Sequence, residues 1–173
     1  MSPLRPRASL PALAVLTTVA LTVAACGGSA AESGGSAGAE GSGEPIPVGI
    51  VFQTTGPTGL YGEQVRDGLE AGLDYATDGT GEVNGRPVEF RFADDGRDPT
   101  KAISAFTEMV GQGVQVFGGT VDSGIAVQLG TLAEQNQVLL IGGNSVGDGL
   151  TGLNEYTFRS SRQIAQEAKL TFE

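Results

Sequence analysis

The sequence contains no histidine, no tryptophan and a single cysteine among its 173 residues. Without histidine, the chain lacks the base of a Ser-His-Asp or Cys-His catalytic group and any histidine ligand for a metal. One cysteine forms neither an intramolecular disulfide nor a structural zinc site. Lysine and arginine are also scarce, 10 against 20 aspartates and glutamates, which gives a formal net charge of -10. Because nucleic-acid affinity depends on cations that neutralise phosphates, we expect no nucleic-acid partner; we also expect no metal and no cofactor.

The first 25 residues have the organisation of a secretory signal peptide. Arg5 and Arg7 precede an apolar stretch over residues 10–23, and small residues follow it up to Cys26. This order of basic, apolar and small segments is typical of a signal peptide. The alternative is a membrane-spanning helix, but the apolar stretch is interrupted by Pro11 and is shorter than the roughly 20 residues that a span needs.

The segment that ends at Cys26 resembles the lipobox of bacterial lipoproteins, in which the cysteine is acylated and becomes the mature N-terminus. Two acyl chains hold a protein stably at a membrane. The next 18 positions, 27–44, are Gly, Ser, Ala and Glu with no large apolar residue. We therefore predict a lipidated cysteine and a flexible tether over residues 26–45, which place the rest of the protein outside the cytoplasmic membrane.

Residues 46–173 alternate between short apolar runs and amphipathic stretches, which predicts an α/β domain. The expected strands are 48–52, 88–92, 114–117, 138–141 and 156–159, and helical stripes lie between them. This alternation favours an open, doubly wound, mostly parallel sheet with helices on both faces, in the flavodoxin-like order 2-1-3-4-5. Ligands of such sheets bind beyond the carboxyl ends of the strands, so we expect a site among the loops 54–62, 118–124 and 142–151.

Three local patterns imitate catalytic or cofactor motifs without their context. Residues 143–147 match the G-x-S-x-G nucleophile elbow around Ser145, but glycines interrupt any following helix and the chain has no histidine. Residues 147–152 match G-x-G-x-x-G, yet they lead into a strand rather than a helix. Asp94 and Asp95 could be paired catalytic carboxylates, but adjacent residues at a strand end point to opposite faces, and we expect a solvated turn.

The loop from Gly118 to Gly124 is the strongest candidate for binding. It connects a strand to a helix, so the hydroxyl of Ser123 and free backbone N–H groups stand at a helix N-terminus, which favours negative charge. Such a loop can hold a carboxylate without altering it. The alternative is that Asp122 or Ser123 serves as an ordinary N-cap of the helix.

Four stretches of the chain resemble the type I periplasmic-type solute-binding proteins of ABC importers, in the branch that binds branched-chain and other amino acids. They follow one another in the family's order and, with the lipobox and tether, cover nearly the whole chain. The stretches are PVGIV and GPTGLYG within 47–62, NGRP and DDGRDP within 84–99, GG and SG within 118–124, and LT and FR within 150–159.

The resemblance implies that a ligand binds between two lobes and that the first lobe grips the carboxylate and ammonium of an amino acid. Tyr61 matches the aromatic position that packs on the ligand, and Ser123, with Gly124, matches the carboxylate-binding hydroxyl loop. Asn144 and Ser145 fall in the loop where the family binds its ligand through carbonyl and hydroxyl groups. This chain has Gly-Gly-Asn in that loop, where the family more usually has Ser, Pro and Ala. Asp122 stands where relatives often have serine, and its carboxylate would weaken the binding of acidic ligands.

The sequence therefore predicts a lipid-anchored extracytoplasmic solute-binding protein that delivers an amino acid or related polar solute to an ABC permease and performs no chemistry. The alternatives are a ligand-sensing receptor domain of the same fold and a secreted α/β serine hydrolase that uses Ser145 or Ser123. We expect residues 46–173 to form the first lobe only, because the chain stops inside a predicted helix at 169–173 before a second lobe begins.

Overall fold

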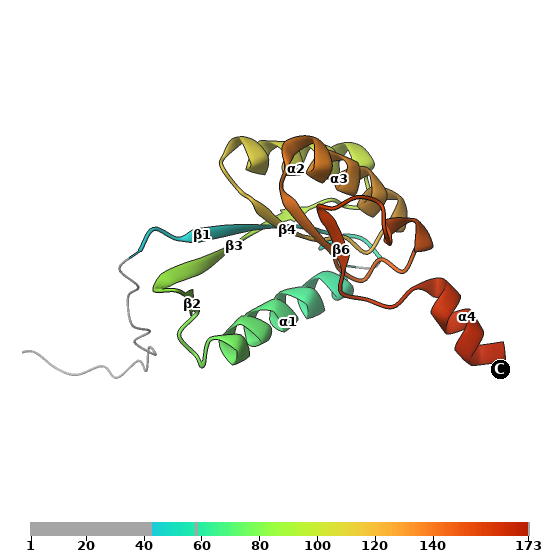
Figure 1. Cartoon of the computed structure of the whole chain (residues 1–173), viewed down its shortest axis with the longest axis horizontal. Coiled ribbons are helices and arrows are strands. Elements are labelled where there is room, and N and C mark those ends of the chain that lie inside the picture. The colour runs from blue at the N-terminus through green and yellow to red at the C-terminus, as the bar shows by residue number, and fades with distance from the viewer. Residues whose placement is uncertain (1–42, 58, 173) are drawn as a thin grey trace, which may run out of the picture. The chain divides into compact units, whose positions relative to one another are not determined.

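The computed structural model describes residues 43–57 and 59–172. The predicted signal peptide and the predicted lipidation site at Cys26 lie outside these residues. Within them, strands and helices alternate along the chain as the apolar pattern predicts (Figure 1). No helix in the described ranges is long and apolar enough to cross a membrane.

Six strands form one sheet in the order β2-β3-β1-β4-β5-β6. Their bounds are β1 Ile46–Phe52, β2 Glu82–Val83, β3 Arg86–Asp94, β4 Val116–Gly119, β5 Leu139–Gly142 and β6 Thr157–Arg159. Every neighbouring pair is parallel except β2 and β3. The five predicted strands occur in the predicted order 2-1-3-4-5, which confirms the doubly wound α/β fold. The sequence pattern did not predict β2, a two-residue edge strand that reaches β3 through the turn at Asn84 and Gly85.

Helices connect the strands and begin where local chemistry permits. Their bounds are α1 Leu60–Ala76, α2 Pro99–Gly111, α3 Ser123–Asn136 and α4 Ile164–Phe172, with a short 3-10 helix, η1, at Asp148–Leu150. The α2 N-terminus follows the prediction: the Asp98 carboxylate accepts hydrogen bonds from the amides of Thr100 and Lys101 at 2.8 and 3.4 Å. Pro99 takes the first helical position, where its missing N–H costs nothing.

The helices α2 and α3 cover one face of the sheet and enclose the core (Figure 1). Phe106 on α2 and Phe117 on β4 are fully buried, and their ring centroids lie 4.1 Å apart. Leu129 and Ala133 bring α3 onto the same cluster. Burial of side chains of this size supplies most of the favourable free energy of folding, so this face holds the domain together.

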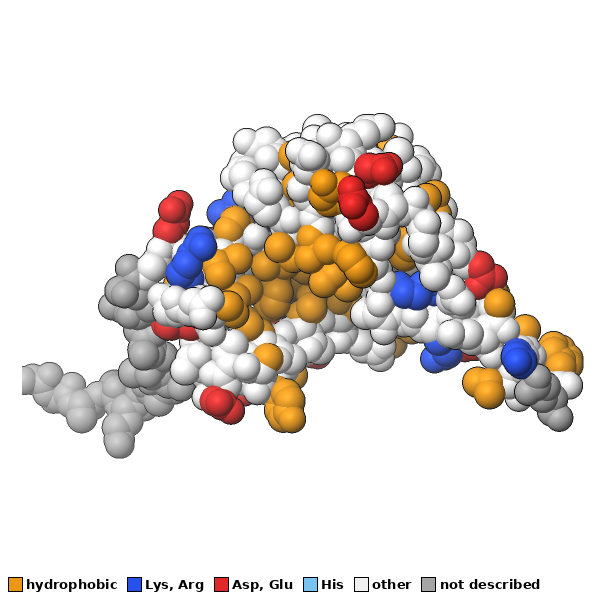
Figure 2. Space-filling view, viewed as in Figure 1, with side chains coloured by type: hydrophobic (Ala, Val, Ile, Leu, Met, Phe, Trp, Pro, Cys, Tyr) orange, Lys and Arg blue, Asp and Glu red, His pale blue; other side chains and the backbone are white. Residues whose placement is uncertain are grey.

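Helix α1 covers the opposite face less closely (Figure 1). The residues of its apolar stripe, Val65, Leu69 and Leu73, are only partly buried, and Ala76 is exposed. Between α1 and strands β1, β4 and β5 lies a largely apolar groove of about 430 Å³, which we call the α1 groove. Figure 2 shows hydrophobic side chains filling the hollow beside α1. The expected covering of both faces is therefore complete on the α2/α3 face only.

Candidate ligand-binding site

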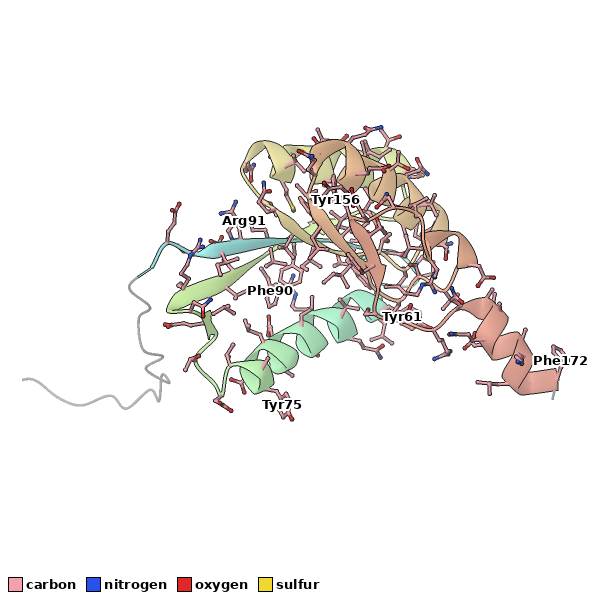
Figure 3. The ribbon with its side chains drawn as sticks, viewed as in Figure 1. Tyr61, Tyr75, Phe90, Arg91, Tyr156 and Phe172 are labelled. Carbon is pink, nitrogen blue, oxygen red and sulfur yellow. The ribbon has the colours of Figure 1, made fainter. Side chains whose placement is uncertain are left out.

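The loops that follow the carboxyl ends of the strands surround a cavity of about 460 Å³. Figure 3 shows Tyr61 at the end of α1 that lies nearest these loops. The β3–α2 loop, the β4–α3 loop, the β5–β6 connection and the segment after β6 supply the other walls. The lining residues are Tyr61, Arg97, Val121, Asp122, Asn144, Val146, Ser161 and Arg162. The site thus lies at the edge of the sheet that the strand order predicts.

An ion pair joins the two central loops of the cavity. The Arg97 guanidinium donates from one terminal nitrogen to Asp122 Oδ2 at 3.3 Å. The other carboxylate oxygen of Asp122 accepts hydrogen bonds from the amides of Gly124 and Ile125 at 2.9 and 3.2 Å. Asp122, rather than Ser123, is therefore the N-cap of α3.

Asp122 carries its negative charge at neutral pH. Partial burial acts to raise the pKa of its carboxyl, but the Ile125 and Gly124 amides and the Arg97 guanidinium outweigh that effect. The net result is a pKa below the ordinary value for aspartate. The cavity wall consequently holds one carboxylate and the two guanidiniums of Arg97 and Arg162.

Asp95 is buried, and the expectation of a solvated turn at Asp94 and Asp95 is wrong for this residue. Its side chain is fully inaccessible, and Oδ2 accepts a 2.6 Å hydrogen bond from the Thr120 hydroxyl. Its other oxygen accepts from the backbone N–H of Arg97 at 2.9 Å. The loop pattern gave no sign of these partners because Thr120 lies 25 residues away. Asp95 thus ties the β3–α2 loop to the β4–α3 loop beneath the cavity.

Of the six ligand-binding residues that the sequence predicts, the cavity is lined by Tyr61, Asp122 and Asn144. Ser123 and Gly124 lie behind its wall: the Ser123 hydroxyl accepts a hydrogen bond from the Gly147 amide at 3.0 Å. It thereby connects the β4–α3 loop to the β5–β6 connection.

Ser145 is also set back from the cavity, with 1% of its surface exposed. Its hydroxyl has no hydrogen-bond partner within the described part of the chain. Its carbonyl accepts from the Ser161 hydroxyl at 3.0 Å. The segment after Ser145 continues into the three-residue η1 rather than a long helix, so the nucleophile-elbow pattern lacks its structural context here as well.

Sequence reasoning missed two cationic residues of the site. Arg97 belongs to the loop after β3, which was not among the three candidate loops, because strand order reverses between β1 and β4 and β3 lies on the other side of β1. Arg162 lies in the segment between β6 and α4, which was also outside the three candidate loops. Its backbone carbonyl accepts from Arg159 at 3.0 Å, and Arg159 also donates to the Gly147 carbonyl. A cation three residues after the end of a strand that pairs with β1 was the signal that could have identified Arg97.

No three acidic, cysteine or histidine side chains come together as a set of metal ligands among the described residues. The lining instead combines guanidiniums, one carboxylate, an amide, hydroxyls and two valines. These groups can form ion pairs and hydrogen bonds with a small polar molecule.

Comparison with known proteins identifies the family. The family model described as "Periplasmic binding protein" matches residues 45–172. The chain belongs to this family. The family consists of binding proteins, in agreement with the prediction that the chain is not an enzyme.

Individual relatives agree with this assignment. The chain is 31% identical to a Leu/Ile/Val-binding protein homologue of Brucella melitensis over 126 residues, which is 72% of this chain and 34% of the relative. A solved structure of an ABC-type branched-chain amino acid transporter from Rhodopseudomonas palustris matches with a TM-score of 0.68 and 33% identity, over 71% of this chain and 34% of that one.

A second solved structure extends the range of ligands among the relatives. It is a solute-binding protein of an ABC transporter from R. palustris in complex with benzoate, with a TM-score of 0.64 and 27% identity. The match covers 70% of this chain and 34% of that chain. The sequence thus spans about a third of the length of each of these relatives, and its sheet matches the first lobe of their fold.

Proposed function

We propose that the chain is the first lobe of the substrate-binding protein of an ABC transporter and binds an amino acid or a related small acid. The observation that carries the proposal is the cavity at the strand ends, lined by charged and hydroxyl side chains with valines between them. Its volume of about 460 Å³ suits a molecule of that size. The relatives named for Leu/Ile/Val, for branched-chain amino acids and for benzoate support the same class of ligand.

In this proposal Tyr61 packs against the ligand and Asn144 offers an acceptor and a donor, while the Asp122 carboxylate can accept only from an ammonium group of an amino-acid ligand. The other three predicted residues do not line the cavity and instead hold its loops in place; they are Ser123, Gly124 and Ser145. Binding in two-lobed proteins closes a hinge over the ligand, so a second lobe would supply the remaining contacts. We expect the lone lobe to bind more weakly than about 1 μM, or roughly -8 kcal/mol.

An NMR titration of the ¹⁵N-labelled chain with each of the twenty amino acids and with benzoate tests the proposal. We expect at least one ligand to shift the amide signals of Tyr61, Asp122 and Asn144 in a saturable way. Signals of β2, which lies at the far edge of the sheet from β5, serve as the internal control. Saturable shifts that spare the cavity residues would contradict this site, and no shift with any of these compounds would contradict the ligand class.

The proposal includes delivery to permease subunits at the outer face of the cytoplasmic membrane, with Cys26 as the lipid anchor. The lipobox-like sequence and the Gly/Ser-rich segment after it support this location. The substitution Cys26→Ser should release the protein from the membrane fraction of cells that express it. Persistent membrane association of the Cys26→Ser variant would contradict the anchor without affecting the ligand proposal.

A further inference from the structure

Part of the anion-binding capacity of this loop is already used inside the protein. A helix N-terminus binds anions through its free backbone N–H groups. At α3, the amides of Gly124 and Ile125 donate to the Asp122 carboxylate. The Ser123 hydroxyl accepts from the Gly147 amide, and Ser123 is not among the residues that line the cavity. The carboxylate of Asp122 thus takes the place at which a ligand's carboxylate would meet the helix, and a ligand acid needs other donors.

Two guanidiniums in the cavity can provide those donors. The side chain of Arg97 is 57% exposed, and among the described residues it donates to one side chain, that of Asp122, at 3.3 Å. Arg162 uses its Nε to reach Glu167, and its terminal nitrogens have no partner in the described part of the chain. A guanidinium has five N–H donors in a planar fork, and two of them match the two oxygens of a carboxylate.

The backbone of Arg97 is held firmly while its side chain remains accessible. The residue has a φ of 62°, in the left-handed region that non-glycine residues rarely adopt. Its N–H donates to the buried carboxylate of Asp95, which Thr120 holds from the other side. The Cα of Arg97 is therefore fixed beside the cavity. A fixed backbone reduces the conformational entropy that is lost when the guanidinium binds a ligand.

We infer that Arg97 and Arg162 recognise the carboxylate of the ligand and that Asp122 competes with the ligand for Arg97. The inference rests on the proposed function, that a small acid or amino acid binds in this cavity. The ligand class is a small monocarboxylate, with or without an α-ammonium group, whose apolar part contacts Tyr61, Val121 and Val146. Arg97 and Asp122 are then residues that set specificity: one attracts the acid and the other limits its affinity.

Two ligands of the same shape test the inference: isoleucine, and 3-methylpentanoate, which is isoleucine without its ammonium. Their dissociation constants are measured by NMR titration of the full chain. We expect Arg97→Gln to weaken both ligands about tenfold, because hydrogen bonds to charged groups are stronger than neutral ones. Arg162→Gln, in a different loop, should weaken both by a similar factor. Asp122→Asn keeps an N-cap side chain but removes the competing charge, and should strengthen 3-methylpentanoate binding by a factor of about three.

The matched control is Arg91→Gln, which removes the same charge from β3 at a position that does not line the cavity (Figure 3). It should leave both dissociation constants within a factor of about two, since exposed charges are well screened by salt. The dispersion of amide signals in each variant shows that the lobe is folded. Arg97→Lys retains the charge without the planar fork and should bind with intermediate affinity.

The outcomes separate the inference from the proposed function. Unchanged binding in both Arg97→Gln and Arg162→Gln would overturn the inference and leave the proposed function standing. Weaker binding of 3-methylpentanoate by Asp122→Asn would show that Asp122 strengthens ligand binding. It would overturn the inference that Asp122 competes with the ligand for Arg97. No binding of any small acid or amino acid by the wild-type chain up to about 20 mM would overturn the proposed function, and the inference with it.

Discussion

The two faces of the sheet carry helices with the same kind of apolar stripe but bury them to different depths. On one face, Phe106 of α2 and Leu129 of α3 are completely enclosed. On the other, Val65 and Leu69 of α1 are half-exposed along the α1 groove. The sequence periodicity of α1 and α2 is similar, so the stripe alone does not determine how much area a helix buries. Burial depends on whether neighbouring elements close over the stripe, and on the α1 side they do so only partly.

The difference has a consequence for the surface of the domain. An apolar groove of about 430 Å³ remains beside α1, whereas on the α2/α3 face Phe106 packs directly against Phe117. Folding free energy from apolar burial scales with the area removed from water. The α2/α3 face should therefore supply most of the stability, and α1 should tolerate change. Three pairs of substitutions test this contrast.

The largest effect is expected from truncation of the core aromatic. Phe106→Ala should lower the free energy of unfolding by about 3–5 kcal/mol, because it removes a buried ring and leaves a cavity. Leu69→Ala on the groove side should cost only about 1 kcal/mol, since much of that side chain stays in contact with water. Urea titration monitored by circular dichroism measures both values. Equal costs would mean that the α1 groove is closed in solution.

The second pair adds a methyl group on each side. A Cβ at Gly49 would lie 2.7 Å from ring atoms of Phe117 and 2.8 Å from Met109 Sδ. Gly49→Ala should therefore destabilise the domain by about 1–3 kcal/mol. A Cβ at Gly68, within α1, meets no atom within 4 Å. Gly68→Ala should stabilise the domain by up to about 1 kcal/mol, because alanine favours the helix.

The same urea titration measures this pair. A loss of stability in Gly68→Ala would reveal that another group fills the groove beside α1. A neutral Gly49→Ala would show that the α2/α3 face is packed more loosely than its burial indicates.

The smallest effect concerns the loop that leads into α1. The Thr55 hydroxyl and the Thr54 amide donate to Asp94 at 2.5 and 2.8 Å and hold the pKa of its carboxyl well below the ordinary 3.8. The folded-state pKa is lowered, so the stabilisation is present above about pH 4 and is lost as the pH falls below it. Asp94→Asn should lower the stability slightly at pH 7 and flatten its decline in acid.

Asp67→Asn, at an exposed position of α1, serves as the control, and urea midpoints between pH 3 and pH 7 provide the comparison. The control should follow the wild-type pH profile. If Asp94→Asn also follows that profile, the tie between β3 and the loop before α1 contributes nothing to stability.

Local patterns in the sequence were sufficient for most of the fold. The strands at 48–52 and 88–92, the N-cap at Asp98 and the strand order 2-1-3-4-5 all agree with the structure. These features depend on side chains a few residues apart and on the general handedness of crossovers, both of which are readable along the chain. The same reasoning placed the candidate site at the carboxyl ends of the strands, and the family resemblance selected Tyr61, Asp122 and Asn144, which line the cavity there.

The rest of the site depends on residues that are distant in sequence. The partner of Arg97 is Asp122, and the partner of Asp95 is Thr120, each 25 positions further along the chain. No sequence periodicity relates such pairs, because loops have no regular spacing of side chains. The contacts of a loop side chain depend on which other loop the fold places beside it. The same limit applies to Ser123, whose hydroxyl meets the Gly147 amide 24 residues away.

The sequence by itself determined the order of strands and helices and the edge of the sheet at which the cavity lies, while the export and anchoring segments stay predictions. The tertiary structure decided which side chains enter the cavity and how completely each helix is buried. The physical reason is the range of the interactions. Secondary structure follows from neighbours along the chain, whereas the Arg97–Asp122 ion pair, the burial of Asp95 and the open α1 groove follow from packing between segments that only the fold brings together.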